Sequence, residues 1–221
     1  MRPSETRPSE TRPSQAMRLA LRDFYANSWR LLFWNAVLGV VLVVSVLAAL
    51  AFPLAAVLVL AAGPVVAVLA HCAVTLVRTG NLFFADAWEG LRLHWRRGLW
   101  LGALGLALGA LGVFAFRFYG HSSLWPFAFL TLYLLVLGAI YELVLWTLAI
   151  AEPERGLAAV AREAAAFVAS RPGATVLLGL ALLLVNVLGI AAALMPFLTL
   201  TVAYTFLATA HFVLPPPEEA V

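Results

Sequence analysis

The sequence predicts an all-α membrane protein: a bundle of about six transmembrane helices with two amphipathic helices at the cytoplasmic surface. Of its 221 residues, 64% are hydrophobic and only 11% are charged. Soluble domains are typically about 45–50% apolar and about 25% charged. A chain of this length has no way to bury so much apolar surface in water, so its solvent must be lipid. The apolar residues also gather in stretches of about 20, the length of a helix that crosses a bilayer.

These stretches place one transmembrane domain at residues 17–214, between a tail at 1–16 and a short tail at 215–221. Near-copies of Arg-Pro-Ser-Glu-Thr fill the first tail, and such a polar, proline-rich repeat is typical of disorder. The six predicted spans are 29–52, 54–77, 99–116, 125–151, 174–195 and 197–213. Pro196 provides the last break, and five spans with a kinked final helix are the alternative.

Arginine placement predicts the orientation of the spans. Thirteen of the fourteen arginines precede the first span, lie at its start, or lie in the connections 78–98 and 152–173. The other three connections together hold only Arg117. Because cytoplasmic loops carry the excess of positive charge, we expect both termini in the cytoplasm.

Both long cytoplasmic connections have the pattern of amphipathic helices. In the first, apolar residues recur at steps of four, three and four: Phe84, Trp88, Leu91 and Trp95. In the second, the stripe is Leu157, Val160, Ala161, Ala164, Phe167 and Val168. We expect both helices to lie flat at the lipid headgroups. The functional alternative is that the first stripe forms a docking face for a partner protein.

The same order of elements occurs twice in the chain, at about 54–116 and 125–195. Each unit has a span, an amphipathic helix, an arginine, a glycine and a new span, through Arg97-Gly98 or Arg171-Pro172-Gly173. Both units have the same orientation, so the pattern predicts a parallel internal repeat that arose by duplication. Chance similarity of hydropathy is the alternative.

Short motifs around the second span carry a resemblance. They are Gly63-Pro64-Val65-Val66-Ala67, Arg78-Thr79-Gly80 and Phe83-Phe84-Ala85-Asp86-Ala87-Trp88. Together with the stretch from Tyr141 to Gly173, they resemble the YesL-like family of bacterial membrane proteins, over residues 27–213. That family has no established activity, and its members often occur beside carbohydrate importers. The resemblance therefore implies a bacterial cytoplasmic membrane and an accessory role, and it supplies no site residue.

Ionisable groups inside a bilayer are costly, so each is a candidate for function. Glu142 in the fourth span and His71 in the second would form a hydrogen-bonded pair, a proton or cation relay, if their helices touch. Asn186 in the fifth span and Tyr204 in the sixth complete the candidate intramembrane polar site. The alternative is that these groups are structural contacts that lock helices together.

Glycines mark one face of the third span. Gly102, Gly105, Gly109 and Gly112 recur at steps of three, four and three, which lets another helix approach closely. The pattern predicts a helix-packing face. Its partner is either another helix of the chain or a second copy.

No motif indicates an enzyme, so we expect no catalytic residue, cofactor or metal site. The single cysteine, Cys72, excludes an internal disulfide. Topology explains the arginines, so nucleic-acid binding is not expected. Two functions stay open: an accessory or scaffold component of a carbohydrate transport system, or a small-solute or ion-coupled transporter with its polar site at Glu142 and His71. The expected partners are the lipid bilayer and either transporter subunits or a second copy.

Overall fold

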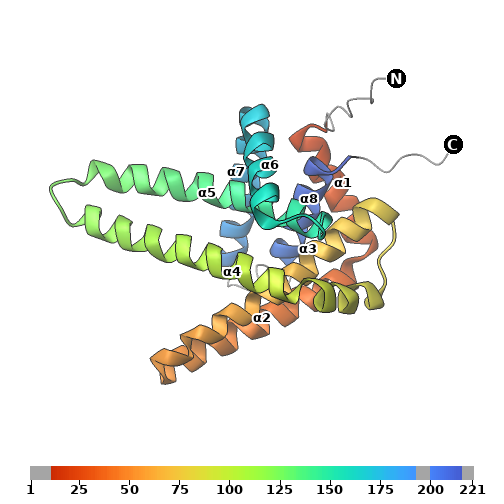
Figure 1. Cartoon of the computed structure of the whole chain (residues 1–221), viewed down its shortest axis with the longest axis horizontal. Helices are drawn as coiled ribbons and strands as arrows, with labels where there is room; N and C mark the ends of the chain where they lie inside the picture. The colour runs from red at the N-terminus through yellow and green to blue at the C-terminus, as the bar shows by residue number, and fades with distance from the viewer. Residues whose placement is uncertain (1–10, 193–199, 216–221) are drawn as a thin grey trace.

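The computed structural model describes residues 11–192 and 200–215, and every regular element in these ranges is helical (Figure 1). The elements are α1 (Pro13–Ala26), α2 (Ser28–Ala51), the 3-10 helix η1 (Pro53–Ala61), α3 (Ala62–Thr79), α4 (Phe84–Gly120), α5 (Pro126–Ala151), α6 (Leu157–Ser170), α7 (Pro172–Ala191) and α8 (Val202–Val213). A helix satisfies its own backbone hydrogen bonds, which suits it to cross lipid. The all-α prediction is therefore confirmed over the described ranges.

Five helical stretches are long and apolar enough to cross a membrane: Ser28–Ala51, Leu54–Thr79, Phe84–Gly120, Pro126–Ala151 and Pro172–Ala191. They overlap the first five predicted spans, so the chain has the helices of a membrane protein. Residues 193–195, at the end of the fifth predicted span, lie outside the described residues. The apolar helix α8 has 12 residues, about 18 Å of helix, whereas the hydrocarbon core is about 30 Å thick. The predicted break at Pro196 and the start of the sixth span at Phe197 lie outside the described residues. The sixth crossing stays a prediction.

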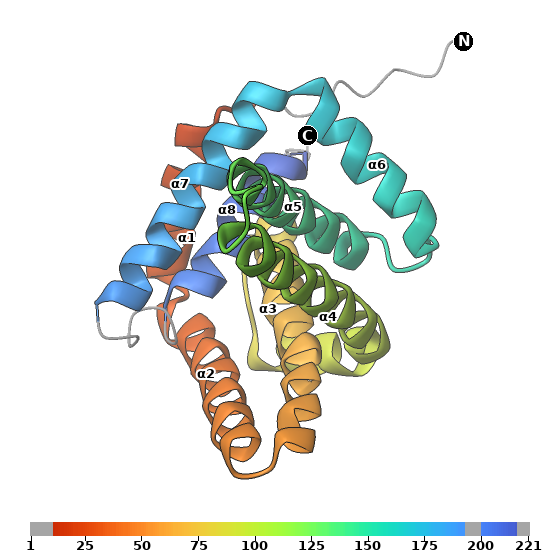
Figure 2. The same ribbon diagram turned by 90° about the vertical axis from the view of Figure 1, so that its left-hand side faces the viewer.

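Two helical hairpins diverge from a common base (Figure 1). One consists of α2 with η1 and α3, and the other of α4 with α5. Helices α1 and α8 lie on the side away from the hairpin tips. In Figure 2, α7 runs across the view while α4 and α5 point toward the viewer. The helices are therefore splayed and do not run alongside one another as in a simple bundle.

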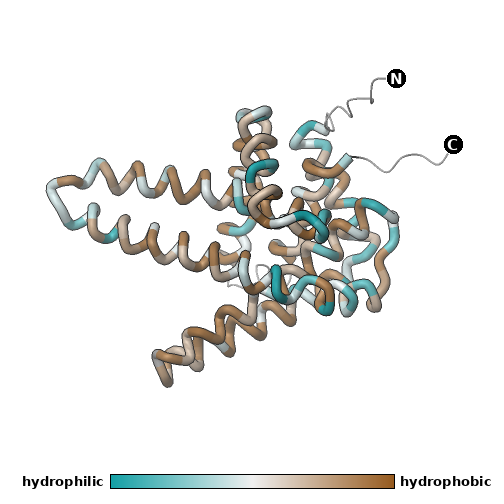
Figure 3. Tube along the Cα trace, in the orientation of Figure 1, coloured by the Kyte–Doolittle hydropathy of each residue, from teal (hydrophilic) through white to brown (hydrophobic). Residues whose placement is uncertain are grey.

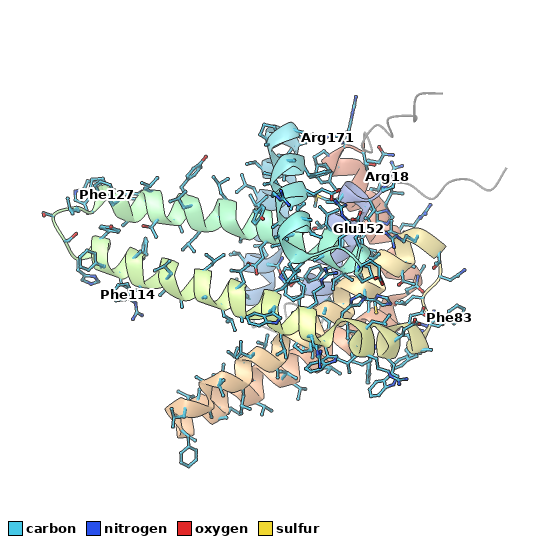
Figure 4. All side chains as sticks on the ribbon, in the orientation of Figure 1. Arg18, Phe83, Phe114, Phe127, Glu152 and Arg171 are labelled. Atoms are coloured by element: carbon cyan, nitrogen blue, oxygen red, sulfur yellow. The ribbon has the colours of Figure 1, made fainter. Side chains whose placement is uncertain are left out.

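Hydropathy separates the hairpins from the base. The hairpins are mostly hydrophobic along their length, and hydrophilic residues gather around the base (Figure 3). Phe114 and Phe127 lie near the tip of the α4–α5 hairpin, and Arg18 and Arg171 lie toward the other end of the molecule (Figure 4). Large apolar side chains on both hairpins are exposed, as expected of surfaces that face lipid.

The buried core lies where α3, α5 and α8 meet. Nine of the twelve residues of α8 are buried. Leu69 and Leu76 of α3, Ala149 of α5 and Phe212 of α8 are almost completely inaccessible. A short apolar helix of this kind is typical of a protein core, so α8 is the central helix of the base.

Helix α1 begins at Pro13, inside the segment expected to be a tail. Proline at the first turn of a helix is favourable because its missing N–H would be unpaired there anyway. Ala16 and Ala20, one turn apart, are fully buried. Since small side chains at this spacing allow close approach, α1 packs tightly on the base. The earlier part of the predicted tail, residues 1–10, lies outside the described residues.

The first amphipathic segment does not end at Arg97-Gly98 as expected. It continues into the following span, and together they form the 37-residue helix α4. The helix starts where the Phe83 backbone N–H donates to Asp86 Oδ2 at 2.7 Å. A lone glycine costs a helix only about 1 kcal/mol, which is too little to break it. At about 55 Å, α4 exceeds the thickness of a hydrocarbon core.

The second amphipathic segment does form a separate helix, α6, which ends before Arg171 and Pro172. Its predicted apolar stripe faces the protein: Val160 and Ala164 are fully buried, and the other four residues pack partly buried against the core. Phe167 packs edge-on against Phe212 of α8, with ring centroids 5.6 Å apart. Because this stripe is already covered by α5 and α8, little of it remains for lipid.

Arginines tie the helices together at the base. Arg97 of α4 donates to the carbonyl oxygens of Ala149 at 2.7 Å, of Glu152 at 3.0 Å and of Arg155. Arg78 of α3 donates to the Ala151 carbonyl at 3.1 Å. The last carbonyls of a helix have no partner within it, so these cations satisfy the end of α5 and complement its dipole. In the loop that follows, hydrogen bonding to Glu152 raises the pKa of Arg155.

Candidate functional site

Glu142 lies on α5 where that helix faces α4. Its Oε1 accepts a hydrogen bond from Trp146 Nε1, one turn later, at 3.3 Å. A Cβ added at Gly105 of α4 would lie 2.1 Å from the same Oε1, so a larger residue there would move the carboxyl group from this position. The absence of a side chain at Gly105 thus makes space on α4 for the Glu142 carboxyl group.

A pocket of about 340 Å³ opens beside this carboxyl group. Its polar lining comes from Glu142 and Trp146 of α5, Asn186 of α7 and Thr205 of α8. The remaining walls are aliphatic except for Phe206, which packs edge-on against Trp146 with ring centroids 6.2 Å apart. We call this cavity the Glu142 pocket. It brings together two of the four residues predicted for the intramembrane site, Glu142 and Asn186.

The Asn186 side chain is held in place by two hydrogen bonds. Its Nδ2 donates to the Leu182 carbonyl at 2.8 Å and to Thr205 Oγ1 at 2.8 Å. Thr205 Oγ1 in turn donates to the Thr201 carbonyl at 2.7 Å. Because a carbonyl oxygen only accepts, the amide nitrogen must be the atom on that side. This network joins α7 to α8 along one wall of the pocket.

Asn35, which was not predicted as a site residue, fixes the start of α8. Its Oδ1 accepts a hydrogen bond from the Ala203 backbone N–H at 2.9 Å, and its side chain is fully buried. The first N–H groups of a helix lack partners within it, and leaving one unpaired away from water is costly. Asn35 therefore acts as a capping residue supplied by another helix, and it positions the Thr205 side of the pocket.

A second groove, of about 440 Å³, lies between α4 and α5 on the other side of Glu142. Gly105, Gly109, Gly112 and Gly138 line it, and Thr131 lies along it. Glu142 and Ala139 line both this groove and the Glu142 pocket. The carboxyl group is therefore placed at the junction of two cavities.

The predicted glycine face serves contacts within the chain at three of its four positions. A Cβ at Gly102 would meet Gly63 of α3 at 3.0 Å, one at Gly105 would meet Glu142, and one at Gly112 would meet Leu135. Nothing lies within 4 Å of a Cβ at Gly109. The face therefore packs mainly on α3 and α5.

His71 is not brought to Glu142. Its ring lies against Gly90 of α4 and 5.1 Å, centroid to centroid, from the ring of His94. Glu142 contacts α4 at Gly105, which is about 22 Å further along the helix. A direct pair of His71 with Glu142 is therefore not formed. The contact of His71 with the buried His94 was missed because the offset between two helices is not visible in the sequence.

Tyr204 also lies outside the Glu142 pocket. Its hydroxyl donates to the Met17 carbonyl of α1 at 3.1 Å. Further along the same two helices, His211 Nε2 and Asp23 Oδ2 are 2.9 Å apart. Both contacts join the first helix to the last. Tyr204 is therefore a helix-packing residue in this structure.

The predicted docking face divides into two parts. Phe84 stacks on Trp29 of α2 at 5.6 Å between ring centroids, and Leu91 packs against the core. Trp88 and Trp95 are exposed, by 58% and 45%. The two tryptophans, together with Phe84, which is still 41% exposed, are available to a partner or to lipid headgroups.

Within residues 11–192 and 200–215, no three histidine, cysteine, aspartate or glutamate side chains gather as metal ligands. No family model matches the chain, and neither a curated protein nor a solved structure matches it.

Proposed function

We propose that this protein binds a small solute in the Glu142 pocket and moves it across the membrane. The observation that supports this is the convergence of a carboxyl group and an amide on one cavity within the apolar part of the molecule. A charged group in lipid surroundings is costly and is retained where it serves a pathway. The volume of about 340 Å³ falls within the range usual for small-molecule sites.

The proposal includes a topology with both termini in the cytoplasm of a bacterium. It is supported by the contacts that join α1 to α8, which bring the first and the last described helices together in the base. The arginines of the base are on that side as well, as cytoplasmic positive charge demands. A sixth crossing by the segment that ends in α8 would complete this topology. The repeated order of elements is compatible with an internal duplication.

Water access to the pocket tests the function. In a Cys72→Ala background, Ala139→Cys places a thiol where the two cavities meet, and Leu132→Cys places one on the same helix but outside both. A small charged thiol reagent is expected to label Ala139→Cys and to leave Leu132→Cys unlabelled. If both stay unlabelled in native membranes, the pocket is dry and the transport function is contradicted.

An accessory role in a carbohydrate transport system, as the YesL-like resemblance implies, is the second candidate. The exposed tryptophans Trp88 and Trp95 support it, since aromatic residues are enriched at protein interfaces. Purification from native membranes in mild detergent should then recover transporter subunits, and Trp88→Ala with Trp95→Ala should lose them. Recovery of the chain alone, or with a second copy, counts against this role.

A further inference from the structure

The polar atoms of the Glu142 pocket that still have hydrogen-bonding capacity are acceptors. Among the described residues, Trp146 Nε1 is the one donor to the Glu142 carboxyl group. Asn186 uses its Nδ2 twice, and no described residue donates to its Oδ1. The hydroxyl hydrogen of Thr205 and the indole N–H of Trp146 are already used. Because acceptors remain and donors do not, the pocket favours a ligand that donates hydrogen bonds.

Charge favours a cationic donor. An ionised carboxylate away from water is strongly stabilised by a positive partner. No arginine of the described residues lines the pocket, and Arg78 and Arg97 are bound to carbonyls at the end of α5. The N-terminal end of α8 would favour an anion, but Asn35 caps it with an amide oxygen. Glu142 is therefore the one acidic or basic group among the lining residues, and a cation is the partner that its carboxylate form would take.

The shape and walls of the pocket favour an organic rather than an inorganic cation. Hard metal cations take about six or more oxygen ligands, and no group of three acidic or histidine ligands exists among the described residues. Trp146 and Phe206 contribute aromatic rings to the lining, and the face of an aromatic ring attracts organic ammonium groups. The aliphatic side chains that make up the rest of the lining would contact an apolar body.

We infer that the Glu142 pocket takes an organic ammonium ion, a protonated amine carried on a small apolar body. This inference rests on the proposed function and names the class of its solute. The ammonium group donates to the Glu142 carboxylate and to Asn186 Oδ1, and the apolar body lies against Trp146 and Phe206.

Three probes of matched size test the solute class: benzylammonium, benzyl alcohol and benzoate. Binding to the full chain in zwitterionic nanodiscs is measured by ligand-observed NMR at neutral pH, with empty nanodiscs as the blank. We expect benzylammonium to bind about tenfold or more tightly than the other two, because a hydrogen bond to a charged group is worth that factor. Glu142→Gln keeps the size of the side chain and an acceptor for Trp146, and it should remove the preference. Glu89→Gln, on an exposed carboxylate of α4, should keep it.

The outcomes separate the solute class from the proposed function. If benzyl alcohol or benzoate binds as well as benzylammonium, and Ala139→Trp abolishes that binding, the pocket is a binding site but the ammonium inference is overturned. A preference for benzylammonium that persists in Glu142→Gln also overturns it. If none of the probes binds, the inference fails, and the labelling of Ala139→Cys decides independently whether the pocket is open to water.

Discussion

The chain contains the same order of elements twice, and the two regions fold differently. In the first, the amphipathic segment and the following span form one continuous helix, α4, which passes through Arg97 and Gly98. In the second, the amphipathic helix α6 ends before Arg171, and α7 begins at Pro172 in a new direction (Figure 2).

The residue after each arginine accounts for the difference. Proline disfavours helical geometry at the residue before it, and Arg171 has φ −139° and ψ 54°, outside the helical region. Gly98 imposes no such restriction, and its missing side chain lets α3 approach to a close contact at Gly63. The spacing of apolar residues thus determines which face of the amphipathic segment is apolar. The residue after the arginine, Gly98 or Pro172, determines whether the next span continues the same helix.

Exchanging that residue should have the largest effect. Gly98→Pro introduces into α4 the break that Pro172 makes in the second region. We expect the free energy of unfolding, measured by titration with SDS in mixed micelles, to fall by about 3 kcal/mol or more. An unchanged free energy would show that α4 does not need to be continuous at this point.

Gly98→Ala separates the break from the steric contact. It keeps the helix, but its Cβ would lie 2.8 Å from the Gly63 carbonyl oxygen and 2.9 Å from the Ala67 Cβ. The expected loss is about 1–3 kcal/mol. The matched control is Gly109→Ala on the same helix, where nothing lies within 4 Å, and it should not destabilise.

The arginine of the first region should have the next largest effect. Arg97→Gln removes charge-assisted hydrogen bonds to three carbonyls, those of Ala149 and Glu152 at the end of α5 and that of Arg155 in the next loop. We expect a loss of about 2 kcal/mol by the same titration. Arg96→Gln is the matched control, since Arg96 is exposed and its guanidinium lies over the Trp95 ring; about 0.5 kcal/mol is expected. If the two variants lost equal free energy of unfolding, the hydrogen bonds of Arg97 would not stabilise the base as described.

A further prediction compares the two amphipathic faces. Ala164→Leu on α6 enlarges a fully buried side chain and should cost about 1–3 kcal/mol. Ala85→Leu makes the same change at an exposed position of α4 and should leave the free energy of unfolding within about 0.5 kcal/mol. If both variants are neutral, the face of α6 is not packed as described.

The smallest effect is expected for Pro172→Ala, about 0.5–1 kcal/mol of destabilisation. The α6 stripe is packed against the core, so α6 and α7 should remain two helices even without the proline. Hydrogen exchange of the backbone amides near Arg171 checks this, and we expect them to stay fast. Strong protection there would mean that proline alone separates the two helices.

The sequence predicted the helical class and the first five spans because these depend on local composition. It also singled out Glu142 and Asn186, which line one pocket in the structure, because polar residues are few in the apolar stretches. It did not identify Asn35 as a cap or Thr205 as a pocket residue, because those roles depend on which helices meet and at what offset. His71 illustrates the same limit: its depth within its own span gave no information about the level of α4 that it contacts.

Helix α1 was missed for a different reason. Its first residues, Pro13 and Ser14, continue the composition of the preceding repeat, and the predicted tail therefore included them. The pair Ala16 and Ala20, which the structure buries, was the part of the sequence that could have indicated a packed helix. Two alanines are a weak indication of burial, and their partner lies near the far end of the chain.

That distance along the chain has a consequence for how the protein is made. Asn35 and Ala203 are separated by 168 residues, and Asp23 and His211 by 188. The ribosome therefore delivers α1 and α2 to the membrane long before the helix that satisfies them exists. Assembly of the base is a step that follows translation, and contacts between such distant segments form slowly. A chain that terminates before Ala203 would lack the backbone N–H that pairs with Asn35 in the finished molecule, and its base would be incomplete.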